Sequence, residues 1–156
     1  MALVLVTGVS GSIAGACASA LRAQGYRVRG TVRSRAPATV SHLTALVPGL
    51  ELVEADLLKD DGWASAVDGC DFVMHIASPF PLFSKDESAI IKPAVEGTKR
   101  VLAACVAAKV KRVVLTSSCA AVGGGYEGTD KGKDGYVFTA RHVGSLAYLR
   151  TTTTFC

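Results

Sequence analysis

The feature that most constrains the fold of this chain is a short apolar run that ends in a glycine turn. Residues 2–7 form the run, and the sequence continues as Thr7-Gly8-Val9-Ser10-Gly11-Ser12-Ile13-Ala14. The run predicts a buried strand, and the apolar residues that follow it recur at helical spacing. Gly25 is expected to end this helix. A strand, a tight turn and a helix in this order are typical of the start of a βαβ unit.

The same alternation continues to about residue 118. Strands are predicted at residues 26–33, 50–55, 71–76 and 112–118, and helices at residues 40–47, 61–67 and 87–108. Strands that alternate with helices favour an α/β fold, a doubly wound parallel sheet with right-handed crossovers. We expect about five strands in this sheet.

The character of the sequence changes after Gly123. Residues 123–135 are rich in Gly, Lys and Asp without apolar periodicity, and Thr151 to Thr154 form a short low-complexity run. We therefore interpret residues 1–125 as one domain and residues 126–156 as a divergent, irregular tail with weak structure.

The composition is that of a globular chain. Hydrophobic residues make up 49% of the 156 residues and charged residues 19%, and no apolar run is long enough to span a membrane. The N-terminus lacks the basic segment of a signal peptide, so we expect a cytoplasmic protein. The five cysteines form no C-x-x-C pair and have no histidine at zinc-finger spacing, which favours free thiols and no metal site.

The distribution of charge indicates an anionic ligand. The formal net charge is +4, and the first acidic residue is Glu51. The arginines that precede it are Arg22, Arg27, Arg29, Arg33 and Arg35. Such an excess of positive charge attracts anions. Nucleic acid is the competing partner, but the chain has no run of Lys and Arg interleaved with aromatic residues, so we favour a phosphate-bearing cofactor.

The glycine turn has the chemistry of a dinucleotide-binding loop. Gly8 permits a tight turn, Gly11 lets a pyrophosphate approach the backbone, and Ala14 is small enough for close packing of the helix on the sheet. The helix start offers unpaired N–H groups to phosphate. This spacing alone often marks an ordinary turn, but its place between a strand and a helix favours binding. The candidate cofactor-binding residues here are Gly8, Ser10, Gly11, Ser12 and Ile13.

The end of the second predicted strand discriminates between two cofactors. An acidic residue there would bind the ribose 2′-hydroxyl of NAD, whereas an arginine suits the 2′-phosphate of NADP. The sequence at this point is Thr31-Val32-Arg33-Ser34-Arg35. We therefore predict NADP, with Arg33 as the main contact of the phosphate. Arg35 is a lesser candidate that is equally well explained as a solvated surface charge.

Several further motifs together resemble one protein family. They are Gly25-Tyr26-x-Val28-x-Gly30-Thr31-Val32-Arg33, Asp56-Leu57, His75-x-Ala77-Ser78-Pro79, Pro93-Ala94-Val95-Glu96-Gly97-Thr98 and Val113-Val114-Leu115-Thr116-Ser117-Ser118. With the glycine turn, they resemble the extended short-chain dehydrogenase/reductases, and within them the dihydroflavonol reductase and cinnamoyl-CoA reductase group. The resemblance covers about residues 2–128.

The resemblance implies a Rossmann fold, an oxidoreductase of the NAD-dependent epimerase/dehydratase superfamily, and NADPH-dependent reduction of a small carbonyl substrate. It implies that Asp56 and Leu57 flank the adenine. Asp56 could simply cap a turn, but the resemblance favours the binding role. It places Ala77, Ser78 and Pro79 near the pyrophosphate and the nicotinamide-side ribose. It also makes Ser118 the catalytic serine, with Ser117 beside the cofactor. By contrast, His75 lies in an apolar strand and is better explained as a buried, hydrogen-bonded residue.

One motif of this family is absent. The family's general acid is a tyrosine in a Tyr-x-x-x-Lys motif, and the fourth residue after Tyr126, Tyr136 and Tyr148 is Asp130, Ala140 and Thr152 respectively. Tyr148 is the best remaining candidate for a catalytic tyrosine. The family's sixth strand and C-terminal substrate-binding region also have no counterpart. We therefore expect an incomplete sheet, a truncated family member, and a chain that is inactive on its own.

Three functional interpretations remain open. The chain could be a working reductase in which Tyr148 acts without a lysine. It could instead be a non-catalytic dinucleotide-binding module with a regulatory role. It could also be a subunit that completes its sheet or site with another chain, through the sheet edge that the fifth strand leaves exposed.

Overall fold

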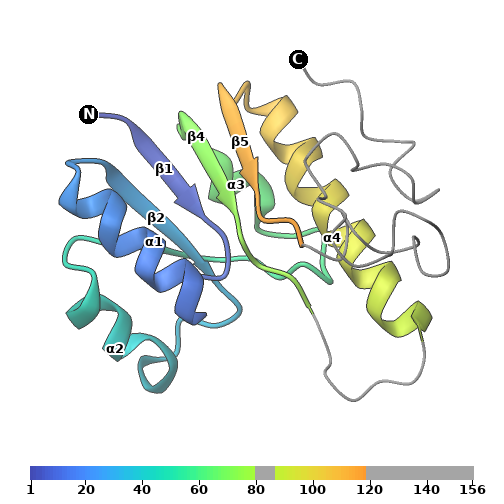
Figure 1. The fold of residues 1–156 in the computed structure, drawn as a ribbon, viewed down its shortest axis with the longest axis horizontal. Helices are drawn as coiled ribbons and strands as arrows, with labels where there is room; N and C mark the ends of the chain where they lie inside the picture. The colour runs from blue at the N-terminus through green and yellow to red at the C-terminus, as the bar shows by residue number, and fades with distance from the viewer. Residues whose placement is uncertain (80–86, 119–156) are drawn as a thin grey trace, which may run out of the picture. The chain divides into compact units, whose positions relative to one another are not determined.

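The computed structural model of the chain describes residues 1–79 and 87–118 (Figure 1). The chain divides into two units, residues 1–116 and residues 117–156. The first unit contains every helix and strand of the described ranges. Of the second unit, only Ser117 and Ser118 are described, so the predicted boundary at residue 125 stays a prediction.

The first unit is built on a parallel sheet of five strands. The strands are β1 (Leu3–Val6), β2 (Arg27–Val32), β3 (Glu51–Glu54), β4 (Phe72–His75) and β5 (Arg112–Leu115). Their order in the sheet is β3-β2-β1-β4-β5, and every neighbouring pair is parallel. The chain therefore adds β2 and β3 on one side of β1. It then crosses to the other side of β1, where it adds β4 and β5. This arrangement confirms the predicted Rossmann-like fold.

Within the described residues, four helices connect the strands. They are α1 (Ser12–Ala23), α2 (Pro37–Leu46), α3 (Trp63–Val67) and α4 (Glu87–Ala107). No helix in the described part of the chain is both long and apolar enough to cross a membrane. All four were predicted, and most of their ends differ from the prediction by one or two residues. The larger difference is at α2, which begins at Pro37 because proline is well suited to the first turn of a helix.

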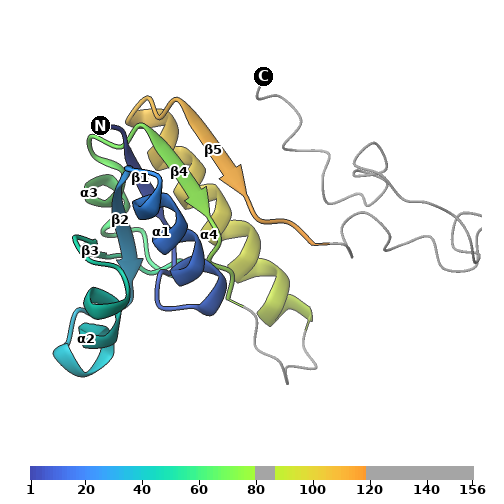
Figure 2. The ribbon, with the colours of Figure 1, turned by 60° about the vertical axis from the view of Figure 1, so that its left-hand side comes forward.

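The helices cover both faces of the sheet (Figures 1 and 2). Because side chains of a strand alternate between the two faces, β1 contributes to two cores. Leu3 and Leu5 pack with residues of α3 and α4, whereas Val6 packs with residues of α1 and α2. All residues of β1 are buried, which is why its sequence is a continuous apolar run rather than an alternating one.

The glycine turn is packed directly onto β2. Val9 is fully buried, and its side chain lies over Gly30 in the middle of β2. A Cβ atom at residue 30 would lie 2.5 Å from Cγ1 of Val9 and 2.7 Å from its Cβ. A glycine is therefore required at this position for the turn after β1 to lie against its neighbouring strand.

We expect the substitution Gly30→Ala to lower the free energy of unfolding by about 1–3 kcal/mol, the usual cost of an added methyl group in a packed core. The measurement is urea-induced unfolding of the full 156-residue chain. Gly15→Ala is the matched control, because a Cβ there meets Val9 O at 3.4 Å and Leu46 Cδ2 at 3.8 Å, which are ordinary contacts. Since Gly15 lies within α1, its replacement should stabilise the chain or leave it unchanged. Equal losses in the two variants would contradict the argument.

Candidate functional site

A pocket of about 620 Å³ lies at the carboxyl ends of β1, β2, β3 and β4. It is lined by residues 8, 10–14, 31–33, 55–58 and 76–79, together with Trp63. The order of the strands reverses between β1 and β4, and in open parallel sheets ligands bind at such a switch point. Every predicted cofactor-binding residue lines this pocket except Ser117 and the lesser candidate Arg35.

The glycine turn forms one wall of the pocket. Gly8 has a φ of +67°, a conformation that favours glycine, and a Cβ atom there would lie 2.8 Å from the Cβ of Ala77, which follows the neighbouring strand β4. The Gly8 N–H donates to Thr31 Oγ1 at 2.8 Å, which ties the turn to β2. Thus the turn is held between two neighbouring strands.

Helix α1 begins in this wall without a side-chain cap. Gly11 occupies the cap position, no acidic residue lies in the first turn, and Ser12, Ile13 and Ala14 line the pocket. The N–H groups of a first helical turn have no partners within the helix, and the helix dipole makes them attractive to anions. This end of α1 can therefore hold a phosphate group.

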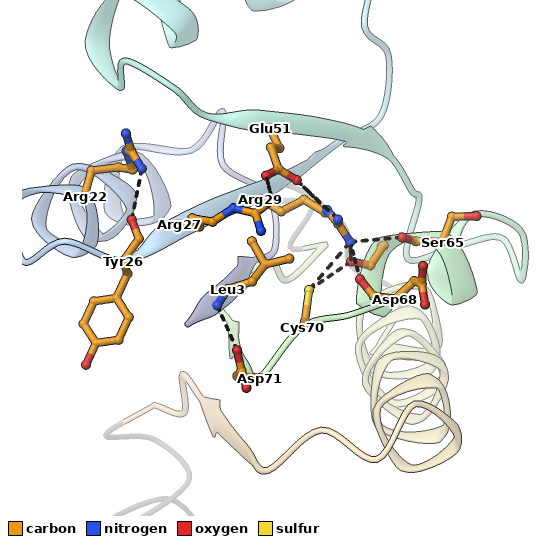
Figure 3. Close-up of polar contacts among 11 residues, drawn as sticks. Leu3, Arg22, Tyr26, Arg27, Arg29, Glu51, Ser65, Asp68, Cys70 and Asp71 are labelled. Atoms are coloured by element: carbon orange, nitrogen blue, oxygen red, sulfur yellow. Dashed lines mark hydrogen bonds and ion pairs between the residues drawn. The ribbon is translucent and has the colours of Figure 1, made fainter. Parts of the chain in front are cut away.

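Three of the five N-terminal arginines make contacts within the protein instead of serving a ligand (Figure 3). Arg22 donates to the carbonyl oxygens of Pro48 and Tyr26. Arg27 and Arg29 both pair with Glu51, and these pairs hold the pKa of that carboxyl below its usual value. Arg29 also donates to the backbone carbonyl oxygens of Ser65, Ala66 and Asp68. Their guanidinium groups therefore mostly make contacts that hold the fold together.

Arg33 differs from those three arginines. It lines the pocket, it is exposed, and it forms no ion pair with any residue in ranges 1–79 and 87–118. Arg35 does not line the pocket, and its backbone N–H donates to Glu54 Oε1 at 2.7 Å. The structure thus separates the two candidates, because only the Arg33 side chain borders the site.

The opposite rim of the pocket is the loop after β3. Asp56 Oδ1 accepts a hydrogen bond from the N–H of Leu58 at 3.0 Å, so this carboxylate caps its own turn and lines the pocket as well. The indole N–H of Trp63 donates to the carbonyl oxygens of Asp56 and Lys59 at 3.1 and 3.2 Å. Trp63 was not among the predicted site residues, and no motif in the sequence connects it to this loop.

The hydroxyl of Thr7 joins the ends of β1 and β4. Its oxygen accepts hydrogen bonds from the N–H groups of Ile76 and Ala77, both at 3.0 Å. It lies 2.9 Å from Nδ1 of His75. A hydroxyl has one proton, and with both N–H groups donating to its oxygen, that proton is donated to Nδ1. His75 therefore carries its own proton on Nε2, which lies 3.4 Å from Thr98 Oγ1.

His75 is buried and hydrogen-bonded, as the sequence analysis favoured. Its side chain is 2% exposed, and burial lowers its pKa from 6.5 to about 4. A protonated imidazole could not accept the Thr7 hydrogen bond, so the neutral form is the one that suits this site.

The catalytic predictions are not tested by the described residues. Ser117 and Ser118 follow β5, are exposed, and begin the second unit of the chain. Tyr148 lies outside the described residues. Their roles stay predictions.

A glycine turn, an uncapped helix start and an exposed arginine around a pocket at the switch point of a parallel sheet define a dinucleotide-binding α/β domain. Comparison with protein families agrees. Residues 4–139 match the NAD dependent epimerase/dehydratase family, and the chain belongs to this family. It therefore carries a reductase-like domain of an NAD(P)-dependent family.

The chain is similar to plant reductases in sequence. It is 45% identical over 123 residues to cinnamoyl-CoA reductase 2 of Arabidopsis thaliana, covering 77% of this chain and 36% of the relative. It is 43% identical over 122 residues to an anthocyanidin reductase of Vitis vinifera, covering 75% and 36% of the two chains. The chain thus spans little more than a third of the length of these relatives.

Solved structures of reductases share the fold. Vestitone reductase from alfalfa is 36% identical with a TM-score of 0.66, over 86% of this chain and 40% of that one. Yeast methylglyoxal/isovaleraldehyde reductase, in a complex with NADPH, is 30% identical with a TM-score of 0.67, over 77% of this chain and 38% of that one.

The lowered pKa of His75 predicts how stability depends on pH. Because the folded chain binds the His75 proton more weakly than the unfolded chain, this stabilisation is present above about pH 6.5 and is lost as the pH falls towards about 4. Between pH 7 and pH 5 the expected loss of unfolding free energy is about 2 kcal/mol. Urea unfolding as a function of pH measures it.

The variant His75→Gln should lose this dependence over the same pH range. His42→Gln is the control, because His42 is exposed on α2 and its loss should leave the wild-type dependence intact. A His75→Gln variant that keeps the wild-type profile would show that another group is responsible.

Proposed function

We propose that residues 1–125 form the NADP(H)-binding domain of a dihydroflavonol or cinnamoyl-CoA reductase-like oxidoreductase that acts on a carbonyl or CH–OH group. The observation that carries the proposal is the pocket at the switch point, in which the start of α1 and Arg33 are both available to phosphate groups. The similarity to plant and yeast reductases supports it.

The preference for NADP over NAD rests on the charges around Arg33. No acidic residue stands at the end of β2, where NAD-binding proteins hold the ribose hydroxyls. Two carboxylates lie at the end of β3 and in the loop after it, and both already accept hydrogen bonds within the protein. Glu54 accepts from the N–H of Arg35, and Asp56 accepts from the N–H of Leu58. Arg33 can therefore pair with a 2′-phosphate through two parallel hydrogen bonds.

The remaining roles are those that the family resemblance implies for these residues. The first turn of α1 would hold the pyrophosphate, Asp56 and Leu57 would flank the adenine, and residues 77–79 would lie beside the nicotinamide half. A bound cofactor would supply the hydride for reduction of a carbonyl. Ser118 would donate a hydrogen bond to the carbonyl oxygen as negative charge develops on it, and Tyr148 is the candidate proton donor.

A second candidate is a module that binds the dinucleotide without turnover. The observation that favours it is the lack of a Tyr-x-x-x-Lys motif in the 156 residues. Without the lysine, nothing in that motif would lower the pKa of the tyrosine or hold the nicotinamide ribose. Such a module could act with a second chain through β5, which pairs only with β4 within the described ranges.

We expect Arg33→Asp to weaken NADPH binding by about tenfold or more, because it removes charge-assisted hydrogen bonds and adds repulsion. NADH affinity should change by less than about twofold, since NADH has no 2′-phosphate. The measurement is titration of cofactor fluorescence with the full chain. Arg35→Asp is the matched control, because it makes the same charge change outside the pocket. Equal losses for both cofactors would refute the assignment of Arg33, and a wild-type chain that binds neither cofactor would refute the function.

Turnover separates the two candidates. The chain, saturated with NADPH, is incubated with a panel of aldehydes, hydroxycinnamoyl thioesters and flavonoid ketones, and oxidation of NADPH is followed by absorbance. We expect binding without turnover. Steady oxidation that depends on a substrate and is abolished by Tyr148→Phe would establish the reductase instead. A mass that rises with protein concentration would support pairing through β5.

A further inference from the structure

Helix α4 contacts the two rims of the pocket without lining it. No α4 residue among those described borders the pocket. Nevertheless, one turn of this helix contacts residues that form or support both rims. The three residues of this turn are Gly97, Thr98 and Arg100. The inference developed from these contacts rests on the proposed dinucleotide-binding function.

The first contact is between Arg100 and the loop that follows β3. Arg100 Nη1 donates to the carbonyl oxygen of Leu57 at 3.0 Å, and its Nε donates to the carboxylate of Asp60. Asp60 is 86% exposed, so the ion pair contributes little by itself. The bond to Leu57 O is partly buried and fixes the backbone of a residue that lines the pocket.

The second contact is the close approach of α4 to the same loop at Gly97. A Cβ atom at residue 97 would lie 2.9 Å from the Cβ of Leu57 and 3.2 Å from its carbonyl oxygen. Gly97 is buried, and Leu57 lines the pocket. A larger residue at position 97 would therefore displace Leu57, which we expect to lie beside the adenine.

The third contact reaches the opposite rim. Thr98 Oγ1 lies 3.4 Å from Nε2 of His75, which is the nitrogen that carries the proton. His75 Nδ1 accepts a hydrogen bond from the hydroxyl of Thr7. The oxygen of that hydroxyl accepts hydrogen bonds from the N–H groups of Ile76 and Ala77. Ile76 and Ala77 line the pocket. A continuous series of hydrogen bonds thus connects α4 to the rim after β4.

We propose that Gly97, Thr98 and Arg100 are positioning residues for dinucleotide binding, and that this single turn of α4 fixes the adenine-side rim and the nicotinamide-side rim relative to each other. Because one rigid helical turn holds both rims, neither can shift without strain at the other. Arg100 and Gly97 act on the adenine half of the ligand, and Thr98 acts on the nicotinamide half.

The first test requires no ligand. Hydrogen exchange of the full chain is followed by mass spectrometry for Arg100→Met and for Lys99→Met, the matched control. Lys99 is the neighbouring cation and pairs only with Glu96 of its own helix among the described residues. The N–H groups of Leu58 and Lys59 are hydrogen-bonded to Asp56. We expect these amides to exchange faster in Arg100→Met and at the wild-type rate in Lys99→Met. Unchanged exchange in Arg100→Met would overturn the proposal.

The second test compares two fragments of the ligand. Arg100→Met should raise the Kd for 2′,5′-ADP by about three- to tenfold and leave that for reduced nicotinamide mononucleotide nearly unchanged. Thr98→Val should instead raise the Kd for reduced nicotinamide mononucleotide and leave that for 2′,5′-ADP nearly unchanged. It should also speed exchange at the Ile76 and Ala77 amides. A purely structural role would lower the unfolding midpoint without altering the ratio of the two affinities.

Gly97→Ala tests the contact with Leu57 without removing a hydrogen bond. Alanine is the better helix former, so α4 itself should not be weakened. The displaced Leu57 should nevertheless weaken 2′,5′-ADP binding by about threefold or more. If Gly97→Ala and Arg100→Met both bind 2′,5′-ADP as the wild type does, the proposal is wrong. If the wild type itself fails to bind the fragment, the proposed function is wrong, and the exchange test still decides whether α4 holds the loop.

Discussion

The pocket of this domain depends on the hydroxyl group of one threonine. At the switch point of the sheet, the chain leaves β1 and β4 towards opposite faces, and the paired register of the two strands ends at Val6 and Met74. Thr7 holds the two departing backbones together, because its oxygen accepts from two N–H groups after β4 and its proton is given to His75. A side chain without a hydroxyl would leave two partly buried N–H groups unpaired.

The fold could be predicted because its signals are local. The buried run of β1, the glycine turn and the helical spacing after it are all read within about twenty residues, and strands and helices then alternate along the chain to residue 115. The predicted binding residues gather in one pocket for the same reason, since the carboxyl ends of parallel strands meet at one edge. The ends of elements were less exact, as at β5, which ends at Leu115 and leaves both serines outside the strand.

Contacts between distant residues could not be predicted in this way. Arg22, Arg27 and Arg29 were counted with Arg33 and Arg35 as positive charge open to an anion, because their partners within the protein are known only once the chain is folded. Asp56 admitted two interpretations, a turn cap or a pocket residue, and its carboxylate fits both. The contacts of α4 with the pocket rims join residues about 20 to 40 positions apart and have no periodic signature.

The uncapped start of α1 would make a bound phosphate part of the folded structure. A helix usually receives its N-terminal cap from its own sequence, and here neither a capping side chain nor an acidic residue is provided. A bound phosphate would supply the missing hydrogen-bond acceptors and the missing negative charge. Because a ligand that binds only the folded state raises the free energy of unfolding, a higher concentration of the cofactor would make the domain more resistant to proteolysis and heat.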